Sequence, residues 1–288
     1  MLTDLAQLLV NGLLAGAMLA VPAIGFTTIY AVLRFPNFAV ASLMTIGAYA
    51  GLVANVSFGL QVGVALLLAF LVAGCFGVAS DEVVLRRLRP AGPLTVAIAS
   101  VALTIVLENA IRFSFGNDLR GYDLPVLRDW RFAGLRVGPQ QVINATAAAV
   151  AMTILFLFLA FTRTGKMMRA VADNPTLAAL KGIDANTVAR LATFVGMGLA
   201  GFGGMLIGMD TSIDPLVGFR VVLSVFAAAV VGGLGSIPGA VAGAFVVGVG
   251  EEVSTIVLDP SYRTAVGFIA ILVVLSLRPR GLLGERAY

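Results

Sequence analysis

Nine apolar segments, each about as long as a lipid bilayer is thick, account for most of the 288-residue chain. A transmembrane helix needs ~20 predominantly apolar residues. The composition agrees, because 59% hydrophobic and 12% charged residues make the chain too apolar for a soluble domain of this length. We therefore predict an all-α polytopic membrane protein, a single domain over residues 1–288 built as a compact bundle of about eight or nine transmembrane helices. The segments are 8–33, 38–56, 61–85, 94–116, 141–162, 187–209, 219–234, 239–257 and 263–278.

The seventh and eighth segments are short and are separated only by a Gly-Ser-Ile-Pro-Gly sequence at 235–239. This pattern fits two crossings, and it equally fits one broken, re-entrant hairpin buried in protein. Small residues four positions apart let helix backbones approach closely in a membrane. Gly47 with Gly51, and Gly235 with Gly239 and Gly243, have this spacing. We expect these glycines to pack helices together.

A 28-residue polar loop, 163–190, contains a short helix with well-defined ends. Asp173-Asn174-Pro175 is typical of a helix start, because an N-cap candidate precedes a proline at the first helical position. Gly182 is typical of a helix end. We predict a surface helix over 175–181 and interpret it as a docking element for a partner. Leu177 and Leu180 lie on one side of this helix, with Ala178 beside them. The alternative is an amphipathic connector that lies on the bilayer.

The positions of the Lys and Arg residues predict the orientation. With an external N-terminus and nine crossings, the C-terminus is cytoplasmic, and 12 of the 19 basic residues face the cytoplasm. The external loop 117–140 has four arginines and three aspartates, which favours a small folded cap. The cytoplasmic set is Arg34, Arg86, Arg87, Arg89, Arg163, Lys166, Arg169, Lys181, Arg190, Arg278, Arg280 and Arg286.

The residues present argue against an enzyme. Histidine is absent, which excludes Ser-His dyads and zinc sites of the HExxH kind. No G-x-x-x-x-G-K-[ST] sequence occurs, so the chain has no P-loop for ATP. Ser236 follows Gly235 in what reads as a tight turn at a helix terminus. We expect no catalytic residue, no metal site and no cofactor in this chain.

Ionisable residues inside a membrane are functional candidates. Glu108 and Arg112 lie four apart in the fourth segment, the favourable order for an internal ion pair, and Asn109 is adjacent. They mark a polar pathway, or they neutralise one another and orient the helix. Asn37 follows Pro36 at the start of the second segment, where a broken helix could expose backbone groups to a solute.

Four stretches resemble the permease family of branched-chain amino acid ABC transporters, the high-affinity type served by a periplasmic binding protein. Their order along the chain is that of the family. Val40-Ala41-Ser42 departs from the family pattern, which has polar groups at this point. The four stretches are Asn37-Phe38-Ala39 with Gly47-Ala48-Tyr49, Arg169-Ala170 through Gly182-Ile183-Asp184, Gly232-Gly233-Leu234-Gly235-Ser236-Ile237-Pro238-Gly239-Ala240 with Gly243 and Glu251, and Arg278-Pro279-Arg280-Gly281-Leu282-Leu283-Gly284.

The resemblance implies a permease of the bacterial inner membrane that translocates branched-chain amino acids or similar small amphipathic carboxylates. It also implies partners: a second, related permease chain, two cytosolic subunits that hold ATP and magnesium, a periplasmic solute-binding protein and membrane lipid, with no nucleic acid. The ATPase-coupling residues would be Arg169, Asp173, Pro175, Leu177, Ala178, Leu180 and Gly182. Candidates for the substrate pathway are Asn37, Ser42, Glu108, Asn109, Arg112 and Ser236.

Two other functions compete with this interpretation. A proton-coupled secondary carrier would use Glu108 as its proton site and would need no ATPase. An assembly subunit without a pore would leave the intramembrane charges without a role. An apolar path discriminates weakly between solutes that differ by a methylene, by about 1–3 kcal/mol. We therefore expect selectivity to reside mainly in the separate binding protein.

Overall fold

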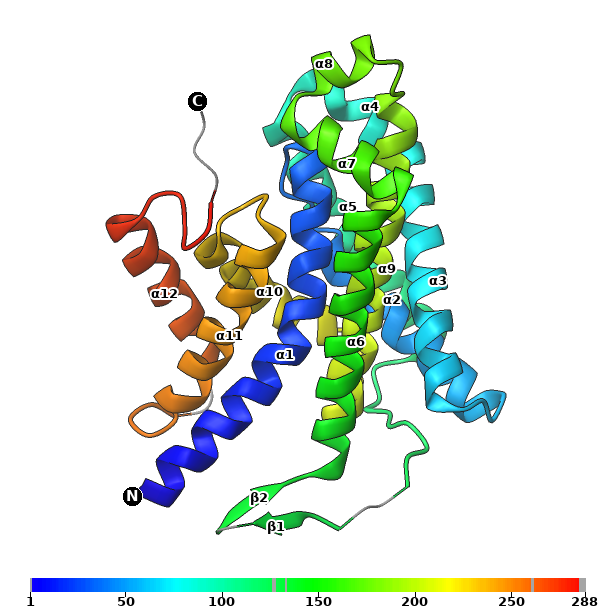
Figure 1. Cartoon of the computed structure of the whole chain (residues 1–288). Coiled ribbons are helices and arrows are strands. Elements are labelled where there is room, and N and C mark those ends of the chain that lie inside the picture. Colours follow the sequence, from blue (N-terminus) through cyan, green and yellow to red (C-terminus); the bar gives the residue numbers. More distant parts are fainter. Residues whose placement is uncertain (1, 126–127, 133, 260–261, 285–288) are drawn as a thin grey trace.

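The computed structural model describes residues 2–125, 128–132, 134–259 and 262–284. These form a bundle of helices that run up and down between two ends, with a small β-hairpin at one end (Figure 1). The α-helices are α1 (Leu2–Leu33), α2 (Val40–Leu52), α3 (Val62–Ser80), α4 (Arg86–Leu88), α5 (Pro93–Phe115), α6 (Pro139–Phe161), α7 (Arg163–Asp173), α8 (Pro175–Leu180), α9 (Ala185–Asp210), α10 (Val217–Gly232), α11 (Ile237–Ser254) and α12 (Arg263–Leu277). Two π-helical turns, η1 (Val53–Ser57) and η2 (Asp81–Leu85), and a 3-10 turn, η3 (Arg89–Ala91), extend them.

The helices confirm the predicted fold class. Seven helical stretches of the described chain are long and apolar enough to cross a membrane. Each of the nine predicted segments coincides with a helix, but α10 and α12 have only 16 and 15 residues. At 1.5 Å per residue these two are about 24 Å and 22 Å long, short of the ~30 Å hydrocarbon core.

The centre of the bundle is α9, which packs on α1, α2 and α3. Its close contacts depend on glycine. A Cβ placed on Gly47 of α2 would lie 2.2 Å from the Cα of Gly201 of α9, and a Cβ on Gly51 would lie 2.3 Å from the sulfur of Met205. At Gly47 the two backbones therefore meet directly, and at Gly51 the backbone of α2 meets the Met205 side chain.

Helices α10 and α11 form a hairpin around the turn that joins them. Gly239 and Gly243 of α11 lie against backbone oxygens of α10. Gly235 does not pack helices, contrary to our expectation: a Cβ there would meet nothing within 4 Å, and its φ of +91° shows that it serves the turn. The spacing pattern failed because Gly235 lies outside both helices.

The C-terminal stretch lies on this turn. Leu282 and Leu283 donate backbone hydrogen bonds to Val231 and Gly232, at 2.8 and 2.9 Å. A Cβ on Gly281, whose φ is +76°, would lie 2.6 Å from the backbone of Gly233. Two of the four stretches that carry the family resemblance are therefore one structural unit. Arg286, assigned above to the cytoplasmic set, lies outside the described residues.

The polar loop 163–190 contains two helices where the sequence predicted one. Helix α8 begins where expected: the Asn174 side chain accepts a hydrogen bond from Leu177 N at 2.9 Å. It ends at Leu180, and Gly182 follows with a φ of +80°. Helix α7 precedes it and packs on α6. Both helices lie at the end of the bundle opposite β1 and β2 (Figure 1).

The segment 117–140 carries the hairpin of β1 (Trp130–Phe132) and β2 (Leu135–Val137), which pair antiparallel. It is fastened to the bundle at several points. Gln7 of α1 exchanges two hydrogen bonds with the backbone of Arg136, at 2.7 and 2.8 Å. The Tyr122 hydroxyl donates to Ala48 O at 2.9 Å, and burial raises the pKa of this hydroxyl.

Candidate coupling surface and solute path

Every residue of α8 except Ala178 is exposed, and the large apolar side chains among them are the two leucines that the sequence singled out. Leu177 is 55% exposed and Leu180 is 80% exposed, although both are apolar. Ala178 is only 4% exposed and packs into the main core. Ala178 therefore holds α8 in place, and Leu177 and Leu180 are the side chains that a partner could reach.

The other residues that the sequence assigned to coupling lie at the ends of α7 and α8 or on the surface of α7. Asp173 is the last residue of α7, and the N-cap of α8 is its neighbour Asn174. Pro175 occupies the first position of α8. Arg169 is exposed on α7, and its guanidinium donates to Ala160 O at 3.5 Å. Gly182 allows the backbone to leave α8.

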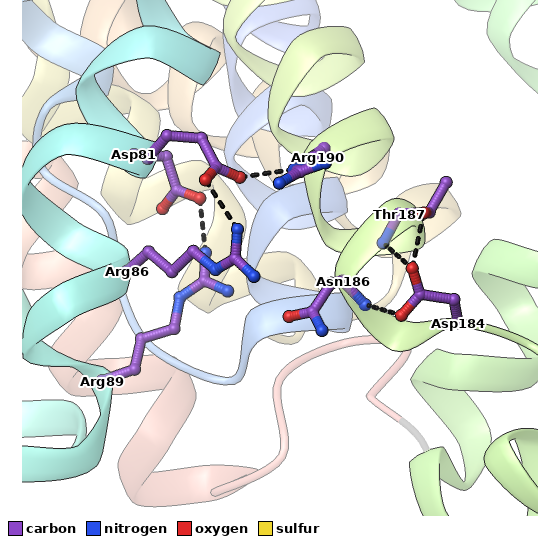
Figure 2. A network of polar contacts seen from close by, with 8 residues as sticks. Asp81, Arg86, Arg89, Asp184, Asn186, Thr187 and Arg190 are labelled. Atoms are coloured by element: carbon purple, nitrogen blue, oxygen red, sulfur yellow. Dashed lines mark hydrogen bonds and ion pairs between the residues drawn. The ribbon is translucent and has the colours of Figure 1, made fainter.

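A network of charged side chains joins the first turns of α9 to the segment that follows α3 (Figure 2). Glu82 accepts from Arg86 at 2.6 Å and from Arg190 of α9 at 2.5 Å. Asp81 accepts from Arg89 at 2.5 Å. The network ties α9, which follows α8 directly, to the chain that leads into α5. Sequence reasoning missed Asp81 and Glu82. Arg190 is distant from them in the sequence, and Arg86 and Arg89 were considered only as positive charges that indicate the cytoplasmic side.

Asp184 caps the start of α9, shortly after α8 ends. Its carboxylate accepts hydrogen bonds from the Thr187 hydroxyl at 2.6 Å and from the backbone N–H groups of Asn186 and Thr187 (Figure 2). The Thr187 hydroxyl, followed by the Asn186 N–H, holds the pKa of this carboxyl below its ordinary value. The cap fixes where α9 begins relative to α8.

The break at Pro36 places Asn37 inside the protein. Asn37 is 1% exposed, and its Oδ1 accepts from Ala39 N at 3.1 Å, while its Nδ2 has no partner in the described part of the chain. The neighbouring Phe38 backbone is held by α5: its N–H donates to Ser100 Oγ at 2.9 Å, and its carbonyl accepts from Thr104 Oγ1 at 3.0 Å. Asn37 thus keeps an unused donor inside the bundle.

Glu108 continues the same face of α5, one turn beyond Thr104. It is 7% exposed, and no hydrogen bond or ion pair to it occurs in the described ranges. The predicted ion pair with Arg112 is not formed. Helical spacing brings the two residues close, and the Arg112 charge acts on Glu108 without a direct contact between the charged groups. Arg112 Nε is buried and has no hydrogen-bond partner among the residues that the structure describes. Two opposite charges are thus present and unpaired.

The remaining pathway candidates do not join this group. Asn109 is exposed on another side of α5 and donates to Ile105 O at 2.7 Å. Ser42 is buried and donates to Ala39 O at 3.0 Å. The Ser236 hydroxyl accepts from Gly239 N at 3.2 Å as the N-cap of α11, so it serves the turn.

Two further polar residues belong with Glu108 but were not selected from the sequence. Ser100 and Thr104 precede it at intervals of four, and both are buried. The Tyr49 hydroxyl of α2 is buried without a partner in the described residues. The four-residue spacing of Ser100, Thr104 and Glu108 was a signal that could have identified this polar face of α5.

Comparison with known proteins identifies the family. Residues 8–277 match the model described as branched-chain amino acid transport system, permease component. The chain belongs to this permease family. It is 32% identical to the high-affinity branched-chain amino acid transport system permease protein BraD of Pseudomonas aeruginosa and 30% identical to LivH of Escherichia coli, over 97% of this chain and 95% of each relative.

More distant proteins agree with the family or with the fold. A probable branched-chain amino acid transport permease protein LivH of Methanocaldococcus jannaschii is 27% identical over 99% of this chain and 95% of its own. PsaBC from Streptococcus pneumoniae, solved in complex with a Fab, matches with a TM-score of 0.54 and 14% identity over 97% of both chains. At that identity the likeness concerns the fold alone. Family membership does not favour the proton-coupled carrier considered from the sequence.

Proposed function

We propose that this permease forms one half of the pore of an ABC importer for branched-chain amino acids or similar small amphipathic carboxylates. A second, related permease would form the other half, a periplasmic protein would deliver the solute, and two cytosolic subunits would hydrolyse ATP with magnesium. The family match over residues 8–277 is the observation that carries this proposal. The chain then needs no nucleotide site of its own.

The N-terminus would be extracytoplasmic and α8 and the C-terminus cytoplasmic. This orientation follows from the positions of the basic residues, because Arg163, Lys166, Arg169 and Lys181 share the end of the bundle that carries α7 and α8. Reporter fusions at Asp4 and after Gly284 test it, and reporters active on the same side of the membrane would contradict it.

Helix α8 is the proposed contact with the ATPase subunits. Leu177 and Leu180 project from a short helix whose ends are fixed by Asn174 and Gly182. A force applied to α8 by a partner would therefore be transmitted to the adjoining segments of the chain. An apolar groove on the partner would bury both leucines. A carboxylate placed there would have to be desolvated, at a cost of several kcal/mol unless it is paired.

The coupling test compares Leu180→Asp with Leu180→Met in the assembled transporter. The aspartate variant should insert normally but lose solute-stimulated ATPase activity and uptake by at least about tenfold, the equivalent of ~1.4 kcal/mol of lost docking. The methionine variant keeps an apolar side chain and should retain both. Ala178→Glu is a different experiment, because it buries a charge in the core and should prevent folding of this region. Normal uptake by Leu180→Asp would exclude α8 as the coupling element.

The polar face of α5 is the proposed solute path. Every α-amino acid carries an ammonium and a carboxylate, whatever its side chain. Glu108 and Arg112 offer one negative and one positive group, both unpaired within the described structure. They could recognise the common zwitterion during transit, while the binding protein chooses among side chains. Asn37 adds a free amide donor.

The path is tested with Glu108→Gln and Arg112→Gln, using Asn109→Ala as the matched control on the exposed side of the same helix. Both charge variants should lower uptake while basal ATPase activity remains, because coupling at α8 is untouched. Loss of one charge-assisted hydrogen bond corresponds to about 1.5–3 kcal/mol, or roughly ten- to a hundredfold. Uptake equal to that of Asn109→Ala would remove this pair from the path.

A further inference from the structure

A long apolar groove runs along the outside of the bundle between α3 and α6. Both helices pack on α9, which forms its floor, and Figure 1 shows the three helices on the same side of the molecule. The groove has a volume of about 790 Å³. Its lining includes Leu67, Phe70, Ala147, Ile154, Phe158 and Phe202. Its one hydroxyl, on Thr146, already donates to Val142 O at 2.7 Å. Only an apolar occupant suits such a lining.

The dimensions of the groove suit an extended hydrocarbon chain. Along α6 it extends from Val142 to Phe158, which is about 24 Å at 1.5 Å per residue. The mean cross-section is therefore roughly 33 Å². A hydrocarbon chain, whose carbons pack at about 4 Å from their neighbours, needs roughly 20 Å². The groove fits one extended acyl chain.

Basic residues gather at one mouth of the groove. Helix α7 starts two residues after α6 ends, and its first turn lies on the last turn of α6: a Cβ on Gly165 would be 2.4 Å from Phe158 O. Arg163 and Lys166 flank Gly165 and are exposed. Neither forms an ion pair with any residue that the structure describes. No acidic residue occurs between Pro139 and Ala172. Asp81 and Glu82, which follow α3 at this end, are already paired with arginines, so the charge of Arg163 and Lys166 is not compensated.

We propose that the groove between α3, α6 and α9 binds an anionic phospholipid, with one acyl chain along α6 and the headgroup on Arg163 and Lys166. Basic residues next to a crevice between membrane helices are a recognised arrangement for anionic headgroups on the cytoplasmic side. The lipid would fill the space that α3 and α6 leave open and would connect α7, directly before the coupling helix, to the membrane. The site rests on the proposed orientation but on neither the cargo nor the ATPase contact.

The experiment uses the assembled transporter in vesicles of phosphatidylcholine with phosphatidylglycerol that carries a photoreactive group in its acyl chain. Labelled peptides should come from α3, α6 and α9. Ala151→Trp, which fills the groove, should reduce this labelling to that of the remaining lipid-facing surface. Ala102→Trp, on the exposed side of α5, should leave it unchanged. If the Ala151→Trp variant does not assemble, Ala147→Leu is a smaller substitution that also fills part of the groove and tests the same site.

The headgroup is tested with Arg163→Gln/Lys166→Gln against Arg128→Gln/Arg131→Gln, which removes equal charge at the other end of the molecule. The preference for phosphatidylglycerol over phosphatidylcholine should fall roughly fivefold for each basic residue lost on α7, from about 1 kcal/mol per residue. The control pair should leave it unchanged. Unaltered labelling in Ala151→Trp, equal labelling by both lipids in the parent, or protein cross-links that replace lipid in the groove would each overturn the proposal.

Discussion

Replacing Arg89 by glutamine should destabilise the protein far more than the same change at its neighbour Arg86. The Asp81 side chain is 2% exposed, and Arg89, itself 25% exposed, is its ion-pair partner. The second oxygen of Asp81, Oδ1, is buried without a hydrogen bond in the described residues. Arg89→Gln would therefore leave a buried carboxylate without its ion-pair partner.

The magnitude follows from burial. Removing one partner of a buried ion pair costs about 3–5 kcal/mol. The pair of Arg86 with Glu82 is 34% and 29% exposed, and Glu82 keeps Arg190 when Arg86 is lost. Such a partly exposed pair contributes about 0–1 kcal/mol. At 2–4 °C for each kcal/mol, Arg89→Gln should lower the unfolding temperature by roughly 6–20 °C and Arg86→Gln by at most about 4 °C.

Thermal unfolding in lipid nanodiscs measures both variants. The double variant Asp81→Asn/Arg89→Gln should recover part of the loss, because it removes the unpaired charge that Arg89→Gln creates. The reasoning would be refuted if Arg89→Gln and Arg86→Gln had the same unfolding temperature. It would equally be refuted if the double variant were less stable than Arg89→Gln alone.

Two further predictions concern single positions. Gly47→Ala should lower the free energy of unfolding by about 1–3 kcal/mol, because the added Cβ overlaps the backbone of Gly201. Gly63→Ala is the control and should be neutral in the same thermal assay, because its Cβ meets nothing within 4 Å. Asp184→Ala should speed hydrogen exchange at the Asn186 and Thr187 amides, and Asp184→Asn should not. Because the folded-state pKa of Asp184 is lowered, its stabilising contribution is complete above its ordinary value of 3.8 and is lost as the pH falls through the lowered value. Amide protection, taken relative to the intrinsic exchange rate at each pH, should fall over that range, and constant protection would contradict the assignment.

The spans and the α8 helix were predictable because their causes are local. A run of apolar residues determines a membrane helix wherever it stands in the chain. Asn174, Pro175 and Gly182 determine the ends of α8 through contacts within a few residues. Helix α7 was missed although its pattern is also local, because a basic loop was read for charge and not for periodicity. Its buried Met168 and Val171 follow helical spacing.

The candidate solute path was only partly predictable, because its geometry depends on distant segments. Spacing alone suggested an ion pair between Glu108 and Arg112, but spacing does not determine whether two charged groups meet, and in the described residues these two do not. Likewise, Ser236 and Gly235 could not be assigned until the turn between α10 and α11 was known. The contact between that turn and the Gly281 segment involves residues nearly fifty positions apart, which no local pattern reports.

The contacts of α5 indicate how a movement of α8 would reach the proposed solute path. Helix α8 packs on α7 and α9. Arg190 of α9 binds Glu82, and the chain from Glu82 runs through η3 and Gly92 directly into α5. Beyond that chain, α5 packs mainly on α2. Because α5 is held mainly along one side, a displacement of its N-terminal end can shift the whole helix. This helix carries Glu108 and Arg112. Arg190→Gln should therefore lower uptake more than ATPase activity, and a proportional loss of both would show that this connection carries no movement.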